Sequence, residues 1–221
     1  MKIHLLLTSL LAVILLSSCS QDEPAMTGND DGSRTEDAAI KYDTRFAVPV
    51  YTDADGYMHL DIDFDSFKYP GSEKLAACLK GKAWQLEMNY DYRVYSDEKG
   101  VPKAELEENP FFNILGGYVQ PKFQIVDESN AKLYDRVFKW DDPAVYTDVI
   151  KPIKYSYDEK TGTLNLHYLH YWRVVLVNES ELWLAGKGPS DIKNVDNFTL
   201  YKLVSVSAET VAEWNKTFKA I

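Results

Sequence analysis

Carboxylates and histidines are the side chains of this sequence that could hold a metal ion. Asp61, Asp63 and Asp65 alternate along a predicted strand, which sets them on one face, about 6–7 Å apart. Such a row could bind calcium weakly at the surface, but a solvated acidic face is the simpler interpretation. His167 and His170 are spaced so that a strand would point them to opposite faces, where they cannot share a metal. We therefore predict no metal site.

No residue is predicted to be catalytic. The sequence has no Gly-x-Ser-x-Gly elbow, no Walker loop and no glycine pattern for dinucleotide binding. Cys78 falls in an apolar helical stripe with Leu75 and Leu79, which indicates a packed cysteine rather than a nucleophile. Acidic residues are numerous enough for a glycoside hydrolase, but no pair is singled out by its surroundings. We expect no cofactor, and a hydrolase remains an alternative class.

Aromatic side chains are the remaining chemical signal. The 15 tyrosines, 9 phenylalanines and 5 tryptophans exceed what one modest core requires. Several of them share a face of a predicted strand, and lining a barrel they would form an aromatic cavity suited to a flat apolar ligand or a sugar. The alternative is that they fill the barrel completely. The candidate ligand-binding residues are Trp84, Tyr90 and Tyr92 on one strand and Tyr134, Phe138 and Trp140 on another.

The charge balance limits the partners. Lys and Arg total 24 against 34 Asp and Glu, which gives a formal net charge of −10. This excess argues against nucleic acid and against anionic lipid headgroups, because both would repel the chain. The hydrophobic content of 45% excludes a wholly disordered protein.

The N-terminus has the pattern of an export signal. Lys2 precedes an apolar run from Ile3 to Leu16, which is too short for a membrane-spanning helix of about 20 residues. The run ends in Leu16-Ser17-Ser18-Cys19, which resembles a bacterial lipobox. The resemblance implies cleavage before Cys19 and attachment of acyl chains such as palmitate to its sulfur and its new amino group. The alternative is an ordinary secretory signal.

Three segments follow from this interpretation. Residues 1–18 form the signal peptide, residues 19–41 the lipidated cysteine with a flexible acidic tether, and residues 42–221 a single β-rich domain. We expect the chain at the outer membrane, held by its acyl chains on the periplasmic face or at the cell surface. Ser20-Gln21-Asp22-Glu23 resembles the signals that export some Gram-negative lipoproteins to the outer face, although plain linker acidity explains it equally well.

Alternation of apolar and polar residues predicts an antiparallel all-β fold. The longest alternating run, from Trp84 to Val94, has one apolar and one polar face, as in a sheet with one wet side. About 8–10 short strands at regular spacing favour a barrel, with a β-sandwich as the alternative. The predicted strands are 46–51, 57–64, 84–94, 118–126, 131–140, 153–157, 163–171, 172–177, 182–185 and 197–204.

Two helices are predicted beside the strands. Ser72 can cap a short helix over 73–80, and Ser207 can cap a C-terminal helix over 208–219. Residues 103–115 fit either a lid loop or a short helix.

A short helix followed by Gly81-Lys82-Ala83-Trp84, then meandering strands and a closing helix, resembles the lipocalin-like β-barrel lipoproteins of Gram-negative bacteria. Thr147-Asp148 is similar to a turn motif of that family. The resemblance covers residues 73–221 and implies that Gly81 marks the first barrel strand while Trp84 plugs the closed end. It leaves residues 46–64 as an extension.

Together these observations predict a membrane-anchored lipoprotein that binds a small hydrophobic or amphipathic ligand inside a β-barrel, without catalysis. The alternative is a surface module that binds a glycan or a protein through exposed aromatic side chains. An open cavity would favour the first, and a fully packed barrel would argue against it.

Replacing Cys19 by serine tests the anchor. The Cys19→Ser chain, expressed in Gram-negative cells, should carry no acyl chains and should move from the detergent phase to the aqueous phase, because its sulfur is the predicted acylation site. Intact mass and phase partition measure both effects. The matched control is Cys78→Ser, which should stay in the detergent phase. An acylated Cys19→Ser protein would show the prediction to be wrong.

Overall fold

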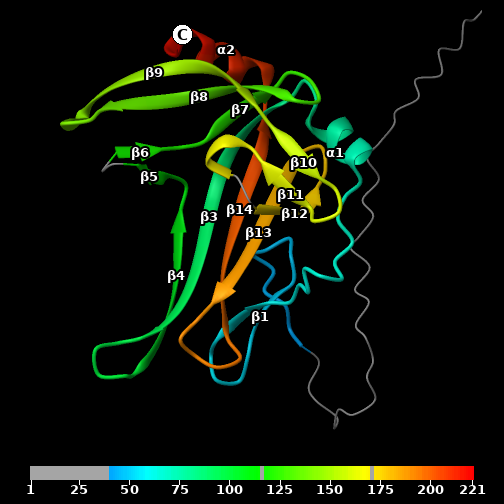
Figure 1. The fold of residues 1–221 in the computed structure, drawn as a ribbon, viewed down its shortest axis with the longest axis vertical. Helices are drawn as coiled ribbons and strands as arrows, with labels where there is room; N and C mark the ends of the chain where they lie inside the picture. Colours follow the sequence, from blue (N-terminus) through cyan, green and yellow to red (C-terminus); the bar gives the residue numbers. More distant parts are fainter. Residues whose placement is uncertain (1–39, 115–116, 170–171) are drawn as a thin grey trace, which may run out of the picture.

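The structure is a computed structural model that describes residues 40–114, 117–169 and 172–221 (Figure 1). The predicted signal peptide, Cys19, most of the tether and His170 lie outside these residues. The described residues form mostly strands with two helices, so the all-β prediction is confirmed.

The elements follow one another in a simple order. The strands are β1 (Val50–Thr52), β2 (Met58–Leu60), β3 (Ala83–Ser96), β4 (Pro102–Asn109), β5 (Phe112–Ile114), β6 (Gly117–Val119), β7 (Lys122–Ile125), β8 (Asn130–Lys139), β9 (Asp142–Lys154), β10 (Ser156–Asp158), β11 (Thr163–Asn165), β12 (Trp172–Val177), β13 (Glu181–Pro189), β14 (Asp196–Val206) and β15 (Lys219–Ala220). The helices are α1 (Ser72–Leu79), α2 (Ala208–Thr217) and the 3₁₀ turn η1 (His167–Leu169).

One large sheet organises the described residues. Its strands lie in the order β10-β11-β12-β13-β14-β3-β7-β8-β9-β15, and β4 pairs with the part of β3 that β7 does not reach. Neighbouring strands are antiparallel except for β15 beside β9. Along this path no ladder of hydrogen bonds joins the two ends within the described residues, so a closed barrel is not found and a sandwich-like sheet also fits. β1 and β2 form a separate antiparallel hairpin, within the strands predicted over 46–51 and 57–64 except that β1 extends to Thr52.

An extra residue in β3 reverses its faces halfway along the strand. The register with β14 shifts between Leu86 and Met88, so Glu87 is a β-bulge. Before the bulge, Trp84 and Leu86 pack into one core, and after it Tyr92 packs into another. The prediction that Trp84 and Tyr92 share a face is therefore wrong.

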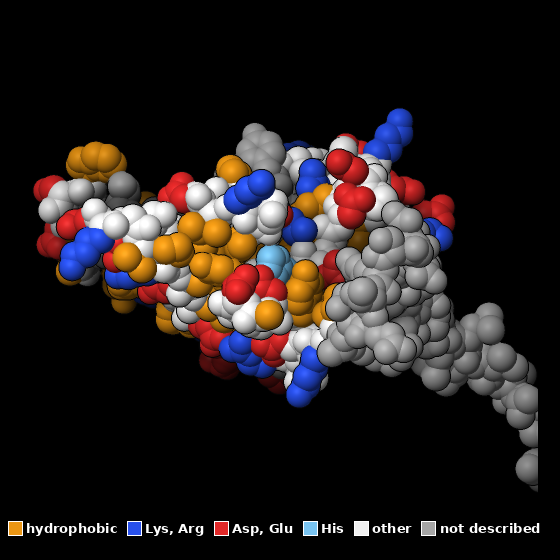
Figure 2. Space-filling model, turned by 90° about the horizontal axis from the view of Figure 1, so that it is seen from below, with side chains coloured by type: hydrophobic (Ala, Val, Ile, Leu, Met, Phe, Trp, Pro, Cys, Tyr) orange, Lys and Arg blue, Asp and Glu red, His pale blue; other side chains and the backbone are white. Residues whose placement is uncertain are grey.

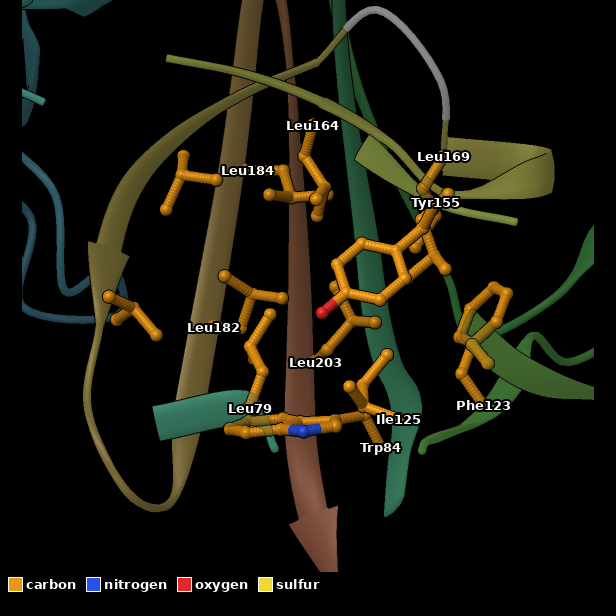
Figure 3. Packing of buried hydrophobic residues seen from close by; sticks show 14 of the residues in the cluster. Leu79, Trp84, Phe123, Ile125, Tyr155, Leu164, Leu169, Leu182, Leu184 and Leu203 are labelled. Carbon is orange, nitrogen blue, oxygen red and sulfur yellow. The ribbon is translucent and has the colours of Figure 1, made fainter. Parts of the chain in front are cut away.

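The first core, called the inner core here, fills the space between the strands on one side of the sheet. Figure 3 shows Trp84, Leu79 and Tyr155 pointing into the same space from β3, from α1 and from the link between β9 and β10. Gly81 links α1 to β3 with φ of +73°, a conformation that glycine adopts without strain. The inner core consists of Leu75, Cys78, Leu79, Trp84, Leu86, Phe123, Ile125, Ala131, Leu133, Tyr155, Leu164, Leu166, Leu169, Val174, Val177, Leu182, Leu184, Tyr201 and Leu203.

The second core, called the outer core here, lies on the opposite side of β3, β12, β13 and β14. The chain from Phe46 to Ile62, including the β1–β2 hairpin, covers this side of the sheet and supplies about half of its buried side chains. The outer core consists of Phe46, Val48, Val50, Met58, Leu60, Ile62, Tyr92, Val94, Val175, Trp183, Ala185, Val195, Phe198 and Leu200. A smaller cluster joins Trp214 of α2 to Tyr134 of β8.

The ends of the helices correct one prediction and confirm another. Ser207 caps α2, since its side chain accepts a hydrogen bond from the backbone N–H of Thr210. Ser72 does not cap α1; its own backbone N–H donates to the Glu159 carboxylate at 2.9 Å instead. The sequence predicts a lid loop or a short helix over 103–115. The described part of this segment, residues 103–114, instead contains most of β4 and all of β5, because β4 extends the sheet beside β3.

Trp84 should contribute strongly to stability. Its side chain is 1% exposed in the inner core, so Trp84→Ala should lower the free energy of unfolding by about 3–5 kcal/mol. Urea unfolding of the unacylated mature chain measures this. Trp84→Phe should lower the free energy of unfolding by less, because the indole N–H that it removes has no hydrogen-bond partner in the described residues. The control is Trp140→Ala, 82% exposed, and a similar loss there would contradict the assignment.

Candidate functional site

The six predicted ligand-binding residues do not meet in one cavity. Trp84 is buried in the inner core, whereas Tyr92 is buried in the outer core beside Phe198. The Tyr92 hydroxyl oxygen accepts a hydrogen bond of 2.9 Å from the backbone N–H of Met58. Tyr90 packs against the outer core and stacks on the ring of Trp183.

The other three lie apart from these and from one another. Tyr134 is 1% exposed and packs against Trp214 of α2. Phe138 lies against Gly117 of β6, and Trp140 is 82% exposed at the end of β8. The two aromatic strand faces that the sequence predicts are thus divided among packed cores and the surface.

A different group of aromatic side chains surrounds a hollow at the edge of the inner core. Tyr168, Trp172 and Tyr201 line a depression of about 560 Å³ together with Gly186 and neighbouring residues of β12 and β13. The rings of Trp172 and Tyr201 meet edge to face with centroids 5.0 Å apart. Phe112 of β5 packs edge to face on Tyr201 at 5.4 Å. We call this hollow the aromatic depression.

Gly186 allows Trp172 to lie directly on the strand. A Cβ atom at position 186 would stand 2.1 Å from the nearest atom of the Trp172 ring, which no side chain could tolerate without displacing the ring. Glycine inside a strand often marks such a close approach. The aromatic depression therefore depends on this residue.

A buried ion network fixes another wall of the depression. Asp135 of β8, 2% exposed, is the buried charged side chain among the described residues. It accepts hydrogen bonds from the Tyr168 hydroxyl at 2.7 Å and from Lys151 Nζ at 2.8 Å. Burial, together with the bond to Asp135, raises the pKa of Tyr168 well above its ordinary value. The phenol is thereby held as a neutral donor, and Tyr168 ties η1 to β8.

The strands beyond the depression form a four-stranded platform of β13, β14, β3 and β4. β12 pairs with β13 only up to Arg173 opposite Ala185, so within the described residues Gly186–Pro189 have a strand neighbour on one side alone. One side of the platform carries the outer core. The other, which we call the polar face, carries cross-strand pairs of polar residues. It consists of Asn89, Asp91 and Arg93 on β3, Glu105, Glu107 and Asn109 on β4, and Thr199 on β14.

A second depression lies where residues 61–65 meet β12 and β13. It measures about 500 Å³ and is lined by Asp61, Asp63, Asp65 and neighbours, with Arg173 and Lys187 on its other wall. The Arg173 guanidinium lies 4.5 Å from the ring centroid of Phe64, within cation–π range. The carboxylates here already accept bonds, from Tyr42 to Asp61 and from Ser66 to Asp63, so this hollow is a less suitable ligand site.

The described residues provide no cluster of three or more histidine, cysteine or acidic side chains that could hold a metal ion. His59 Nε2 lies within hydrogen-bond distance of Asp53 Oδ2, at 2.8 Å, and the His59 ring stacks on Tyr51. No helix in the described part of the chain is long and apolar enough to cross a membrane.

Comparisons of the chain with protein-family models, with curated proteins and with solved structures found no match.

Sequence reasoning missed Tyr168, Trp172 and Tyr201. One signal could have located them. Gly186 directly follows the apolar run Leu182–Ala185, and a glycine in a strand indicates that a ring or another backbone lies close by.

Tyr201 should make stability depend on alkaline pH. Burial, with a smaller effect of Asp91, raises its pKa from 10.0 to about 12. Between those pH values the folded chain keeps a proton that the unfolded chain releases, so the free energy of unfolding should fall as pH rises. In Tyr201→Phe the fall should be less steep, as measured by urea unfolding across this window. Trp140→Phe, which removes no titrating group, should keep the original slope; an unchanged slope in Tyr201→Phe would refute the assignment.

Proposed function

We propose that this chain is a membrane-anchored lipoprotein whose folded part binds a small amphipathic ligand without catalysing a reaction. Acyl chains on Cys19 hold it at the outer membrane, and the acidic tether separates the folded part from the lipid. The ligand occupies the aromatic depression. The observation that carries the proposal is the pair of rings, Trp172 and Tyr201, with Trp172 lying on the backbone of Gly186, at a solvent-open hollow.

The sequence led us to expect the ligand inside a barrel, but we propose the edge of the inner core instead, because buried side chains occupy the space between the strands. The space between the strands is occupied by buried side chains, among them those of Leu79, Trp84, Leu182 and Leu203, which point toward one another (Figure 3). An apolar ligand enclosed by the strands would have to displace them. A hollow of about 560 Å³ at the surface is of the size that small-molecule sites have.

For the sheet, a lipocalin-like barrel is the arrangement that we favour. Its support is that β9 and β10, the strands toward the two ends of the sheet path, follow each other with only Tyr155 between them. Further support comes from α1 ahead of β3, from Trp84 packed in the inner core with Leu79, and from α2 after β14. A β-sandwich is the alternative arrangement.

A second candidate function is a surface module that binds a glycan or a protein. The β8–β9 hairpin projects from the rest of the molecule (Figure 1), and Trp140, Val145 and Tyr146 on it are 82%, 51% and 48% exposed. Figure 2 shows hydrophobic side chains gathered on one face among acidic and basic ones. Exposed apolar clusters of this kind often mark interaction surfaces.

Binding of a neutral aromatic probe distinguishes the two candidates. N-phenylnaphthylamine should bind the unacylated mature chain at one saturable site, seen as a rise in its fluorescence. Trp172→Ala should weaken binding at least tenfold, equivalent to about 1.4 kcal/mol, because it removes the ring that the probe contacts. Trp140→Ala is the matched control and should bind as the unchanged chain does. The reverse result would favour the surface module.

A further inference from the structure

The polar face continues directly from the aromatic depression. On β14, Tyr201 stands opposite Asn89 of β3, and Thr199 stands opposite Asp91 of β3 on one side and Gly186 of β13 on the other. Residues directly opposite in antiparallel strands project to the same side, with Cβ atoms about 5 Å apart. The aromatic rings and the polar side chains therefore project to the same side of the sheet.

Asn89 has an unsatisfied acceptor just beneath this surface. Its Oδ1 atom is buried and has no hydrogen-bond partner among the residues that the structure describes, and the next residue across the strand is Tyr201 of the aromatic depression. Buried polar atoms in native proteins nearly always have a partner, so this oxygen indicates a donor that the described residues do not supply. A ligand hydroxyl lying over Tyr201 would be such a donor.

The polar face carries more carboxylates than basic groups and so selects against anions, whereas the aromatic depression beside it is lined by Arg173 and Lys187. Asp91 and Glu107 form one cross-strand pair, and Glu105 stands opposite Arg93, which is itself paired with Asp91. Carboxylates accept hydrogen bonds from hydroxyl groups but repel a ligand carboxylate or phosphate. Thr199 already donates to Asp91 at 3.2 Å, which orients that carboxylate along the face.

The length of the face suits a ligand of several units. β4 has eight residues, which at about 3.3 Å each extend roughly 26 Å from the aromatic depression outward. The side of the platform that carries the outer core is covered by the chain from Phe46 to Ile62, whereas Glu105 and Glu107 on the polar face are exposed to solvent.

We propose that the aromatic depression and the polar face together bind a neutral oligosaccharide. The C–H face of one sugar ring stacks on Trp172, a hydroxyl donates to Asn89 Oδ1, and further hydroxyls donate to Asp91 and Glu107 along the strands. This inference rests on the proposed function and names the chemical class of its ligand.

The test is calorimetric titration of the unacylated mature chain with hexasaccharides of glucose, mannose, xylose and galacturonic acid. At least one neutral hexasaccharide should bind, and the acidic galacturonic one should bind more weakly than it. Trp172→Ala should weaken the binding of both the sugar and N-phenylnaphthylamine at least tenfold. Asn89→Leu should lower the affinity for the sugar about tenfold while the probe still binds. Asn89→Asp keeps an acceptor oxygen, so its affinity for the sugar should fall less.

Neighbouring residues of β4 supply a matched control. Glu107→Gln, on the polar face, should lower the affinity for the sugar. Glu108→Gln changes the opposite side of the same strand and should leave that affinity unchanged. If the probe binds but no neutral sugar does, or if the acidic sugar binds best, the inference is overturned and the proposed function stands. If neither probe nor sugar binds, both are overturned. Equal effects of the two glutamate variants would also overturn the inference.

Discussion

A single extra residue in β3 decides which sides of the sheet can be apolar. Without the bulge at Glu87, the alternation that starts at Trp84 would carry Tyr92 into the same core as the tryptophan. The bulge instead divides the strand between two cores on opposite sides, so the N-terminal segment has an apolar surface to cover. It also turns Asn89 and Asp91 away from that segment. The polar face exists because of this one reversal.

Rigid support surrounds the aromatic depression on three sides. Tyr201 projects from the middle of β14, which is paired along its length with β13 and β3. Tyr168 is tied to β8 through buried Asp135, and Trp172 lies on Gly186. Rings held by backbone pairing and a buried ion network lose little freedom when a ligand docks, which favours binding by a preformed surface.

Local signals predict the elements well, and contacts distant in the chain account for the errors. The α2 cap at Ser207 lies next to its helix and is visible in the sequence, whereas the bond to the α1 terminus comes from Glu159, 87 residues away. Alternation alone cannot reveal the bulge, since an apolar residue stands at every second position on both sides of it. The depression escaped prediction because Trp172 acquires its position from Gly186, on the next strand.

The unpaired edges of the platform carry residues that resist further pairing. β4 presents Lys103, Glu105 and Glu107 along an edge that meets only β3 within the described residues, and β13 ends in Pro189, which has no N–H to donate. When copies of this chain are crowded together, the charged side chains of β4 repel one another and Pro189 offers no N–H. Both effects oppose the pairing of a strand of one molecule with a strand of the next. The sheet edges thereby disfavour edge-to-edge association at high local density.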